Sequence, residues 1–197
     1  MSFDTPLVEY LIIGVHTSTW IYFVFLKLLN YPITTVSKID TAVVLPLLPF
    51  IYIVGMIFDD ITYRVLRSRI KKIKDGVRLS WEKKKNKANN SSKNSANPDE
   101  YKDETLANRS EVLYNAYEAK VRRVRIVGSA IFNWPILGLS ILANIGLTTP
   151  IMIPLLITTT VLTISSWLVW NGLYVRAYEF RLKAIDEIRE SKGKQAH

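Results

Sequence analysis

Four long apolar runs divide the chain, and charged residues are concentrated between the second and third runs and after the fourth. A bilayer core about 30 Å thick is crossed by roughly 20 apolar residues, at about 1.5 Å of helix each. Four segments approach that length with few ionised side chains, at about residues 7–26, 42–58, 126–147 and 151–175. The pattern therefore predicts an all-α integral membrane protein with four transmembrane helices.

The first run lies close to the N-terminus, where a cleavable signal peptide would also lie. It contains Glu9, His16 and Trp20, and no basic residue precedes it. A signal peptide has a basic region before a shorter apolar stretch. We therefore expect the first run to be a membrane helix.

The positions of Lys and Arg predict the orientation. Residues 60–125 carry 18 of the 26 basic residues, 6 follow Leu173, and the remaining 2 are Lys27 and Lys38 in the first hairpin. Basic loops resist translocation across a membrane. We therefore expect both termini and the central loop to be cytoplasmic, which in a bacterium would make this an inner-membrane protein.

Apolar residues recur at helical spacing in the three stretches that adjoin the membrane segments. In the first of these the recurring residues are Ile61, Val65, Ile70, Ile73 and Val77. Three membrane helices should thus extend into the cytoplasm as a helical stalk, whose apolar stripes need partners within or between protomers. Residues of about 83–103 are rich in Asn, Ser and Lys and predict a disordered loop. The expected divisions are 1–59 (first hairpin), 60–125 (cytoplasmic helices and loop), 126–175 (second hairpin) and 176–197 (amphipathic tail).

Polar side chains inside the predicted membrane segments are the main functional candidates, because such groups are costly in hydrocarbon unless they face protein or water. Glu9 and His16 are two helical turns apart on one face of the first segment. The third segment carries a polar stripe, and the fourth carries a row of hydroxyl groups. These candidate residues are Glu9, His16, Ser129, Asn133, Ser140, Asn144, Thr159, Thr163 and Ser166.

Two interpretations of these polar residues compete. In the favoured one they serve packing: hydroxyl groups bond to their own helix, and Asn133 and Asn144 bond to a neighbouring helix. In the other, the stripes line a wet path for an ion or small solute. His16 could be a packing residue, a proton relay near Glu9 or a pH sensor, and we favour packing. Periodicity alone does not decide between water and a neighbouring helix.

Two further features lie on or beside the third segment. Pro135, after Trp134, removes a backbone hydrogen bond and predicts a kink that could act as a hinge. At the cytoplasmic boundary, acidic and basic residues should pair across helices and fix their vertical register. This expected charge cluster consists of Asp59, Asp60, Arg64, Arg122, Arg123 and Arg125.

Composition narrows the range of functions. There is no cysteine and there are only 2 histidines, so thiolate chemistry is excluded and a histidine-rich metal centre is not expected. No phosphate-binding loop, hydrolase elbow or metalloprotease motif occurs. The net charge of +9 is explained by membrane topology, so nucleic acid is not an expected partner. We expect no catalytic residues, no cofactor and no enzymatic activity.

The sequence therefore favours a homo-oligomeric membrane scaffold whose cytoplasmic helices dock a soluble protein and couple it to the bilayer. The basic residues that follow the second segment could also hold anionic lipid headgroups. The alternative is a channel or pore-forming effector, such as one acting in a bacterial stress or antiviral system, with the polar stripe of the third segment facing an oligomer axis.

Overall fold

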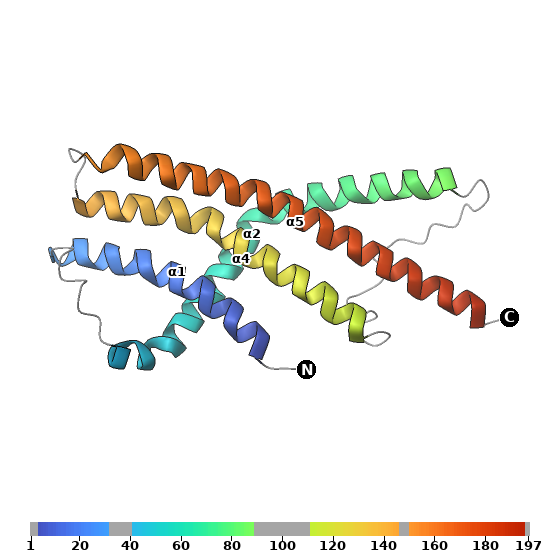
Figure 1. Cartoon of the computed structure of the whole chain (residues 1–197), viewed down its shortest axis with the longest axis horizontal. Coiled ribbons are helices and arrows are strands. Elements are labelled where there is room, and N and C mark those ends of the chain that lie inside the picture. The colour runs from blue at the N-terminus through green and yellow to red at the C-terminus, as the bar shows by residue number, and fades with distance from the viewer. Residues whose placement is uncertain (1–3, 32–40, 89–110, 146–149, 196–197) are drawn as a thin grey trace. The chain divides into compact units, whose positions relative to one another are not determined.

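The computed structural model describes residues 4–31, 41–88, 111–145 and 150–195. These residues form four α-helices and, within those ranges, no strand (Figure 1). The helices are α1 (Asp4–Leu28), α2 (Thr41–Ala88), α4 (Glu111–Ile145) and α5 (Met152–Gln195). The all-α prediction is confirmed for the described chain.

Each of the four helices is long and apolar enough to cross a membrane. The segments with this character are Leu7–Leu28, Pro46–Lys84, Glu111–Ile145 and Met152–Ile188. Each predicted apolar run lies in a different one of these helices. The four apolar helices predicted from the sequence are thus confirmed for the described residues.

The ends of the helices refine the predicted boundaries. After α1, Asn30 has a φ of 56°, and the amide of Tyr31 donates to the carbonyl of Leu26 over 2.9 Å. Asn is one of the few residues that adopt this left-handed conformation readily, so it ends the helix. Helix α2 continues to Ala88, although a disordered loop was expected from about residue 83. The rest of that expected loop lies outside the described residues.

The chain forms two compact units. The first unit comprises Met1–Leu66 and Arg125–Trp170, and the second comprises Arg67–Val124 and Asn171–His197. Each contains parts of several helices.

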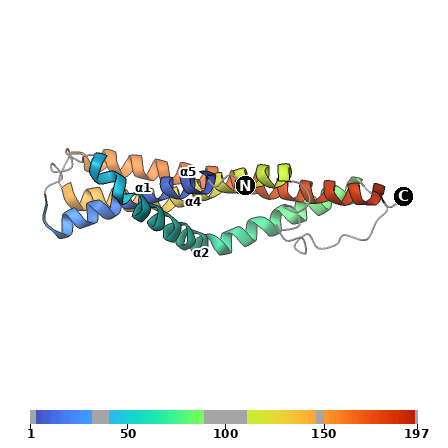
Figure 2. The ribbon, with the colours of Figure 1, turned by 90° about the horizontal axis from the view of Figure 1, so that it is seen from below.

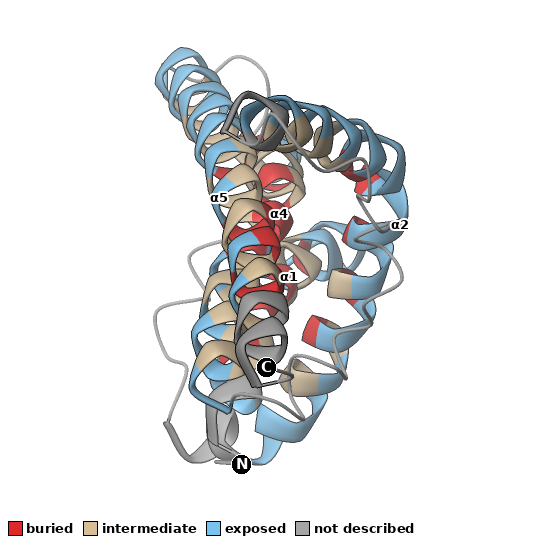
Figure 3. Ribbon diagram, turned by 90° about the vertical axis from the view of Figure 1, so that its right-hand side faces the viewer, coloured by how far each residue is buried: buried red, intermediate tan, exposed pale blue. Residues whose placement is uncertain are grey.

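In the first unit, α1 lies alongside α4 (Figure 1 and Figure 2). Contacts join Glu9 to Arg125, Trp20 to Asn133 and Phe23 to Asn144, so the two helices run parallel. Helix α4 is the most enclosed, because 39% of its most apolar stretch is buried, against 11% for α5 (Figure 3). This makes α4 the centre of the first unit.

Helices α1 and α2 cross with their backbones in direct contact. A Cβ atom at Gly14 would overlap the carbonyl oxygen of Ile51, and one at Gly55 would overlap the carbonyl oxygen of Tyr10. Small residues permit such close approach where apolar helices pack. Gly14 and Gly55 therefore have a packing role at this crossing.

Helices α4 and α5 of the first unit are antiparallel. A Cβ atom at Gly138 would lie 2.6 Å from Cγ2 of Thr159, and one at Gly128 would lie 3.1 Å from Nε1 of Trp170. The outer face of α5 exposes large apolar side chains, including Ile157, Ile164 and Leu168. Apolar exposure of this extent is typical of a surface that faces lipid or another protein.

In the second unit, α5 is the central helix. Tyr178, Leu182 and Ile185 are buried on it, at the helical spacing predicted from the sequence. From α4, Leu113, Tyr114 and Tyr117 pack against Ala184 and Ile185. The apolar stripes of these two helices therefore find partners within one chain.

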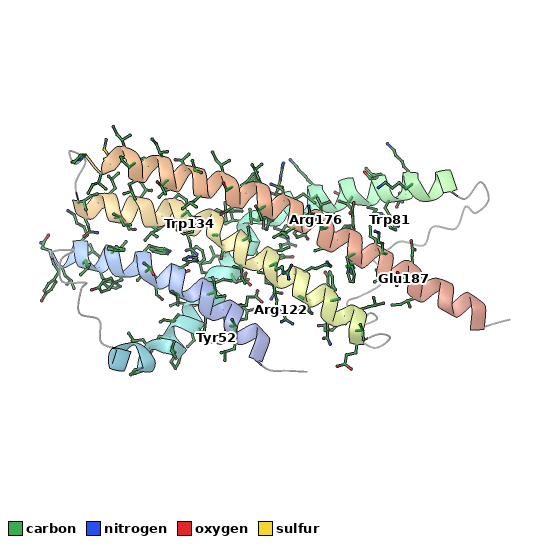
Figure 4. All side chains as sticks on the ribbon, viewed as in Figure 1. Tyr52, Trp81, Arg122, Trp134, Arg176 and Glu187 are labelled. Atoms are coloured by element: carbon green, nitrogen blue, oxygen red, sulfur yellow. The ribbon has the colours of Figure 1, made fainter. Side chains whose placement is uncertain are left out.

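Helix α2 contacts the same part of α5, and the two helices run parallel there. The ammonium of Lys74 lies 5.8 Å from the centre of the Tyr178 ring, and the indole of Trp81 donates to Oδ2 of Asp186 over 3.2 Å (Figure 4). The buried positions of the second unit on α2 begin at Ile70. Ile61 and Val65, which the sequence placed on the same stripe, belong to the first unit and are exposed.

Candidate functional site

The polar side chains of α1 and α4 meet in the first unit and form what we call the polar seam. It consists of Glu9, Thr17, Trp20, Arg125, Asn133 and Asn144. On α1 the residues Glu9, Ile13, Thr17 and Trp20 follow at intervals of four, four and three, which places them on one helix face. The first three are buried, so this face is the one that α1 turns toward its neighbours.

Asn133 is the centre of the seam and is only 3% exposed. Its Oδ1 accepts a hydrogen bond from Nε1 of Trp20 over 2.9 Å. The hydroxyl of Thr17 lies 2.9 Å from the carbonyl of Ile13 and 3.3 Å from Oδ1 of Asn133, and its single proton can go to either. An indole N–H can only donate, so Trp20 fixes which end of the amide faces α1.

The other end of the same amide is also buried. Nδ2 of Asn133 has no hydrogen-bond acceptor among the described residues. A buried donor without an acceptor costs about 1–3 kcal/mol. The hydrogen bond from Trp20 therefore offsets part of the free energy that burying the Asn133 amide costs.

The remaining polar residues of α4 are bonded within the protein. Nδ2 of Asn144 donates to the carbonyl of Phe23 on α1 and to that of Ser140, both over 2.8 Å. Ser129 donates to the carbonyl of Ile126 over 2.8 Å, and Ser140 donates to that of Ile136 over 2.7 Å. The packing interpretation describes bonds of this kind. They do not test directly whether the stripe also lines a wet path.

Glu9 and Arg125 form the charged end of the seam. Oε1 of Glu9 lies 3.8 Å from Nη1 of Arg125, with the Glu9 side chain 3% exposed and that of Arg125 42% exposed. Arg125 also interacts electrostatically with Asp59 on α2. Arg125 thus lies half in solvent, paired with Glu9 and near enough to Asp59 of α2 to act on its charge.

The expected charge cluster is assembled only in part. Asp60 pairs with Arg64 over 2.8 Å on the same helix, four positions apart, instead of across helices, and both side chains are well exposed. Arg125 lies in the first unit with Asp59, but it forms an ion pair with Glu9, which the sequence had not assigned to it. Arg122 and Arg123 belong to the second unit. Residues four apart on a helix are neighbours, which explains the local pair.

The other candidate residues have local roles. The ring of His16 lies 5.2 Å from that of Trp134 in an edge-on arrangement, and α4 is continuous through Pro135 (Figure 4). On α5, Thr159 donates to the carbonyl of Leu155 over 2.9 Å, and Thr163 donates to that of Thr159 over 2.7 Å. Ser166 is half-buried. A hinge at Trp134 and Pro135 stays a prediction.

Three residues of the site were not singled out from the sequence. Trp20 was noted only as a member of the first segment, Thr17 was not among the candidates, and the close approach at Gly14 was not foreseen. The available signal was the spacing of Thr17 and Trp20 from Glu9, at eight and eleven positions, which follows the buried face of α1. Which helix that face meets is not encoded in the spacing.

The chemistry of this arrangement is that of helix association. Among the described residues, no group of three or more His, Asp or Glu side chains is placed to hold a metal ion. The seam instead combines one half-buried ion pair, two amides and an indole, each directed at a partner on another helix. No protein-family model, curated protein or solved structure matches this chain.

Proposed function

We propose that this protein is a four-pass membrane anchor, with both termini in the cytoplasm, whose second unit docks a soluble protein and couples it to the bilayer. The observation that carries the proposal is the burial of the polar residues of α4. Ser129, Asn133 and Ser140 are at most 6% exposed within a single chain. Residues that line a path along an oligomer axis would instead be open to that axis.

The structure of the second unit supports the docking part of the proposal. Its core is formed by α4 and α5, and α2 adds the Trp81–Asp186 hydrogen bond. A unit with its own packed core can hold a fixed surface outside the membrane. Leu79 and Val112 are exposed large apolar residues on it, at 59% and 79%.

A homo-oligomer is a separate part of the proposal. In the second unit, α4 and α5 cover each other's apolar stripes, so a second copy of the protein is not needed to cover them. A second copy would instead contact the exposed membrane face of α5. Cross-linking of the purified protein in mild detergent tests this, and an exclusively monomeric species at high concentration would remove the oligomer from the proposal.

The orientation can be tested cleanly because the chain contains no cysteine. Single cysteines at Tyr31 and at Leu79, both exposed, report opposite sides of the membrane. In spheroplasts with an intact inner membrane, an impermeant maleimide should label Tyr31→Cys. It should label Leu79→Cys only after the membrane is permeabilised. Labelling in the reverse order would overturn the orientation.

The docking function is tested by placing a photoreactive residue at Leu79 or at Leu168. The first lies on the second unit, and the second lies on the apolar outer face of α5. Leu79 should cross-link to a soluble protein, whereas Leu168 should yield only lipid or a second copy. Identical products at the two positions would contradict docking by the second unit.

The pore alternative is tested by ion flux through liposomes that contain the purified protein. The anchor proposal expects no flux above that of empty liposomes across a range of pH and voltage. Flux that disappears in Asn133→Leu and Asn144→Leu, with both variants folded, would favour the pore and overturn the anchor.

A further inference from the structure

The outward face of α2 changes from apolar to basic just beyond Val65. Ile61, Tyr63 and Val65 are 49%, 54% and 58% exposed. On the opposite side, Thr62, Leu66 and Ile70 are buried at intervals of four. The outward apolar surface of this helix thus extends to Val65, about two turns beyond the end of the second predicted membrane segment.

Basic residues follow immediately on the outward side. Arg67, Lys71 and Lys72 are all exposed. Lys72 lies seven positions after Val65 and therefore continues the same helix face. Arg64 is committed to Asp60, so the excess positive charge begins at Arg67.

We propose that Arg67, Lys71 and Lys72 form a binding surface for anionic phospholipid headgroups. This inference rests on the proposed membrane function, because the exposed apolar residues up to Val65 require hydrocarbon around them. The headgroup layer is about 5–7 Å thick on each side of the bilayer core. Lys72 is about 10 Å of helix beyond Val65, within reach of headgroups for a long flexible side chain.

Phospholipid is favoured over other anionic partners by the continuity of the two surfaces. Two exposed lines of α2 pass from an apolar to a basic side chain, one from Val65 to Lys72 and one from Tyr63 to Arg67 and Lys71. Each line matches the order of acyl chain and phosphate in a lipid. Each basic residue near an anionic membrane surface strengthens binding by about fivefold. The attraction falls within a Debye length of about 8–10 Å.

The same helix offers a matched control. Lys83 and Lys84 form a second exposed lysine pair, twelve positions farther along α2. They are about 27 Å of helix beyond Val65, or roughly three Debye lengths. Replacing either pair removes the same charge from the same protein, and only the first pair is placed to meet headgroups.

The experiment uses the full chain in vesicles of phosphatidylcholine and phosphatidylglycerol. After gentle extraction, native mass spectrometry measures the ratio of the two lipids that remain bound. We expect enrichment of phosphatidylglycerol on the unchanged protein, a loss of about fivefold or more in Lys71→Gln/Lys72→Gln, and no loss in Lys83→Gln/Lys84→Gln. High salt during extraction should abolish the enrichment without any mutation.

Equal enrichment in all three proteins, or equal loss in both variants, would overturn the lipid inference. So would unchanged lipid enrichment combined with loss of the protein cross-link at Leu79, which would assign these lysines to the soluble partner. Alkaline extraction of membranes separates this inference from the proposed function. If the unchanged protein is released by alkali, both fail, whereas retention without lipid enrichment overturns the lipid surface alone.

Discussion

Trp20 donates its indole N–H to Oδ1 of Asn133 over 2.9 Å, although the two residues are 113 positions apart. The bond joins α1 to the centre of α4 at a position where Asn133 is almost fully buried. It therefore links α1 to α4 through a buried amide and a half-buried indole.

The first prediction concerns this bond. Trp20→Phe and Asn133→Leu should each lower stability, and the double variant should lose less than the sum of the two. Hydrogen bonds between membrane helices contribute about 0.6 kcal/mol on average and up to about 1.7. We expect a coupling free energy within that range from unfolding in detergent.

A control for this cycle is the exposed Thr160 on α5. Thr160→Val combined with Asn133→Leu should give additive losses, because Thr160 lies on another helix face. Additivity for Trp20 and Asn133 as well would mean that their contact carries no net stability.

The helices themselves could be predicted because run length and apolar content are local properties of the sequence. Their pairing could not, since it depends on side chains more than 100 positions apart, such as Glu9 and Arg125. A periodic polar stripe indicates that Asn133 and Ser129 share a face, but it gives no information on whether that face meets a helix or water. The structure supplies the partner by placing Trp20 opposite Asn133.

The partner of Asp60 also differs from the one expected from the sequence. From the sequence, opposite charges at one level were expected to pair across helices. The structure pairs Asp60 with Arg64 one turn away, because an i, i+4 pair forms without any demand on tertiary geometry. Gly55 is comparable: glycine permits both a bend and a close approach, and only the position of Tyr10 identifies the second.

The second prediction concerns the crossing of α1 and α2. Gly14→Ala and Gly55→Ala should each destabilise the protein, because the added Cβ would overlap a backbone carbonyl and force the helices apart. Overpacking of this kind costs about 1–3 kcal/mol, and a backbone obstacle places these sites toward the upper end. Thermal unfolding in detergent measures the loss.

Gly76→Ala is the control for that series. No atom lies within 4 Å of a Cβ built at Gly76, and the residue is inside α2. Alanine should stabilise the helix there by up to about 1 kcal/mol. If the alanine variants at Gly14 and Gly55 behave like that at Gly76, the two helices do not make backbone contact.

The third prediction concerns the asymmetry of the Glu9–Arg125 pair. Arg125→Gln should cost more than Glu9→Gln. The first substitution leaves a carboxylate that is 3% exposed without its guanidinium, while the second leaves an arginine side chain that is 42% exposed and retains Asp59 nearby. Stability falls more when the substitution leaves a buried charge without its partner than when it removes the buried charge itself.

We expect a loss of about 1–3 kcal/mol for Arg125→Gln and a smaller loss for Glu9→Gln. The double variant should recover part of the loss, since neither charge then remains. Equal losses in the two single variants would show that Glu9 is solvated in the folded protein.

The last prediction separates the two units. Ile185 is 4% exposed in the core of the second unit, where α4 packs against α5, whereas Leu79 is 59% exposed on α2. Ile185→Ala should remove about 2–4 kcal/mol of packing, and Leu79→Ala should be nearly neutral. Hydrogen exchange should then increase along 113–124 and 177–188 in the first variant, while the amides around Asn133 remain protected. Loss of protection throughout both units would mean that they unfold as one cooperative body, and no change at all would remove Ile185 from the core.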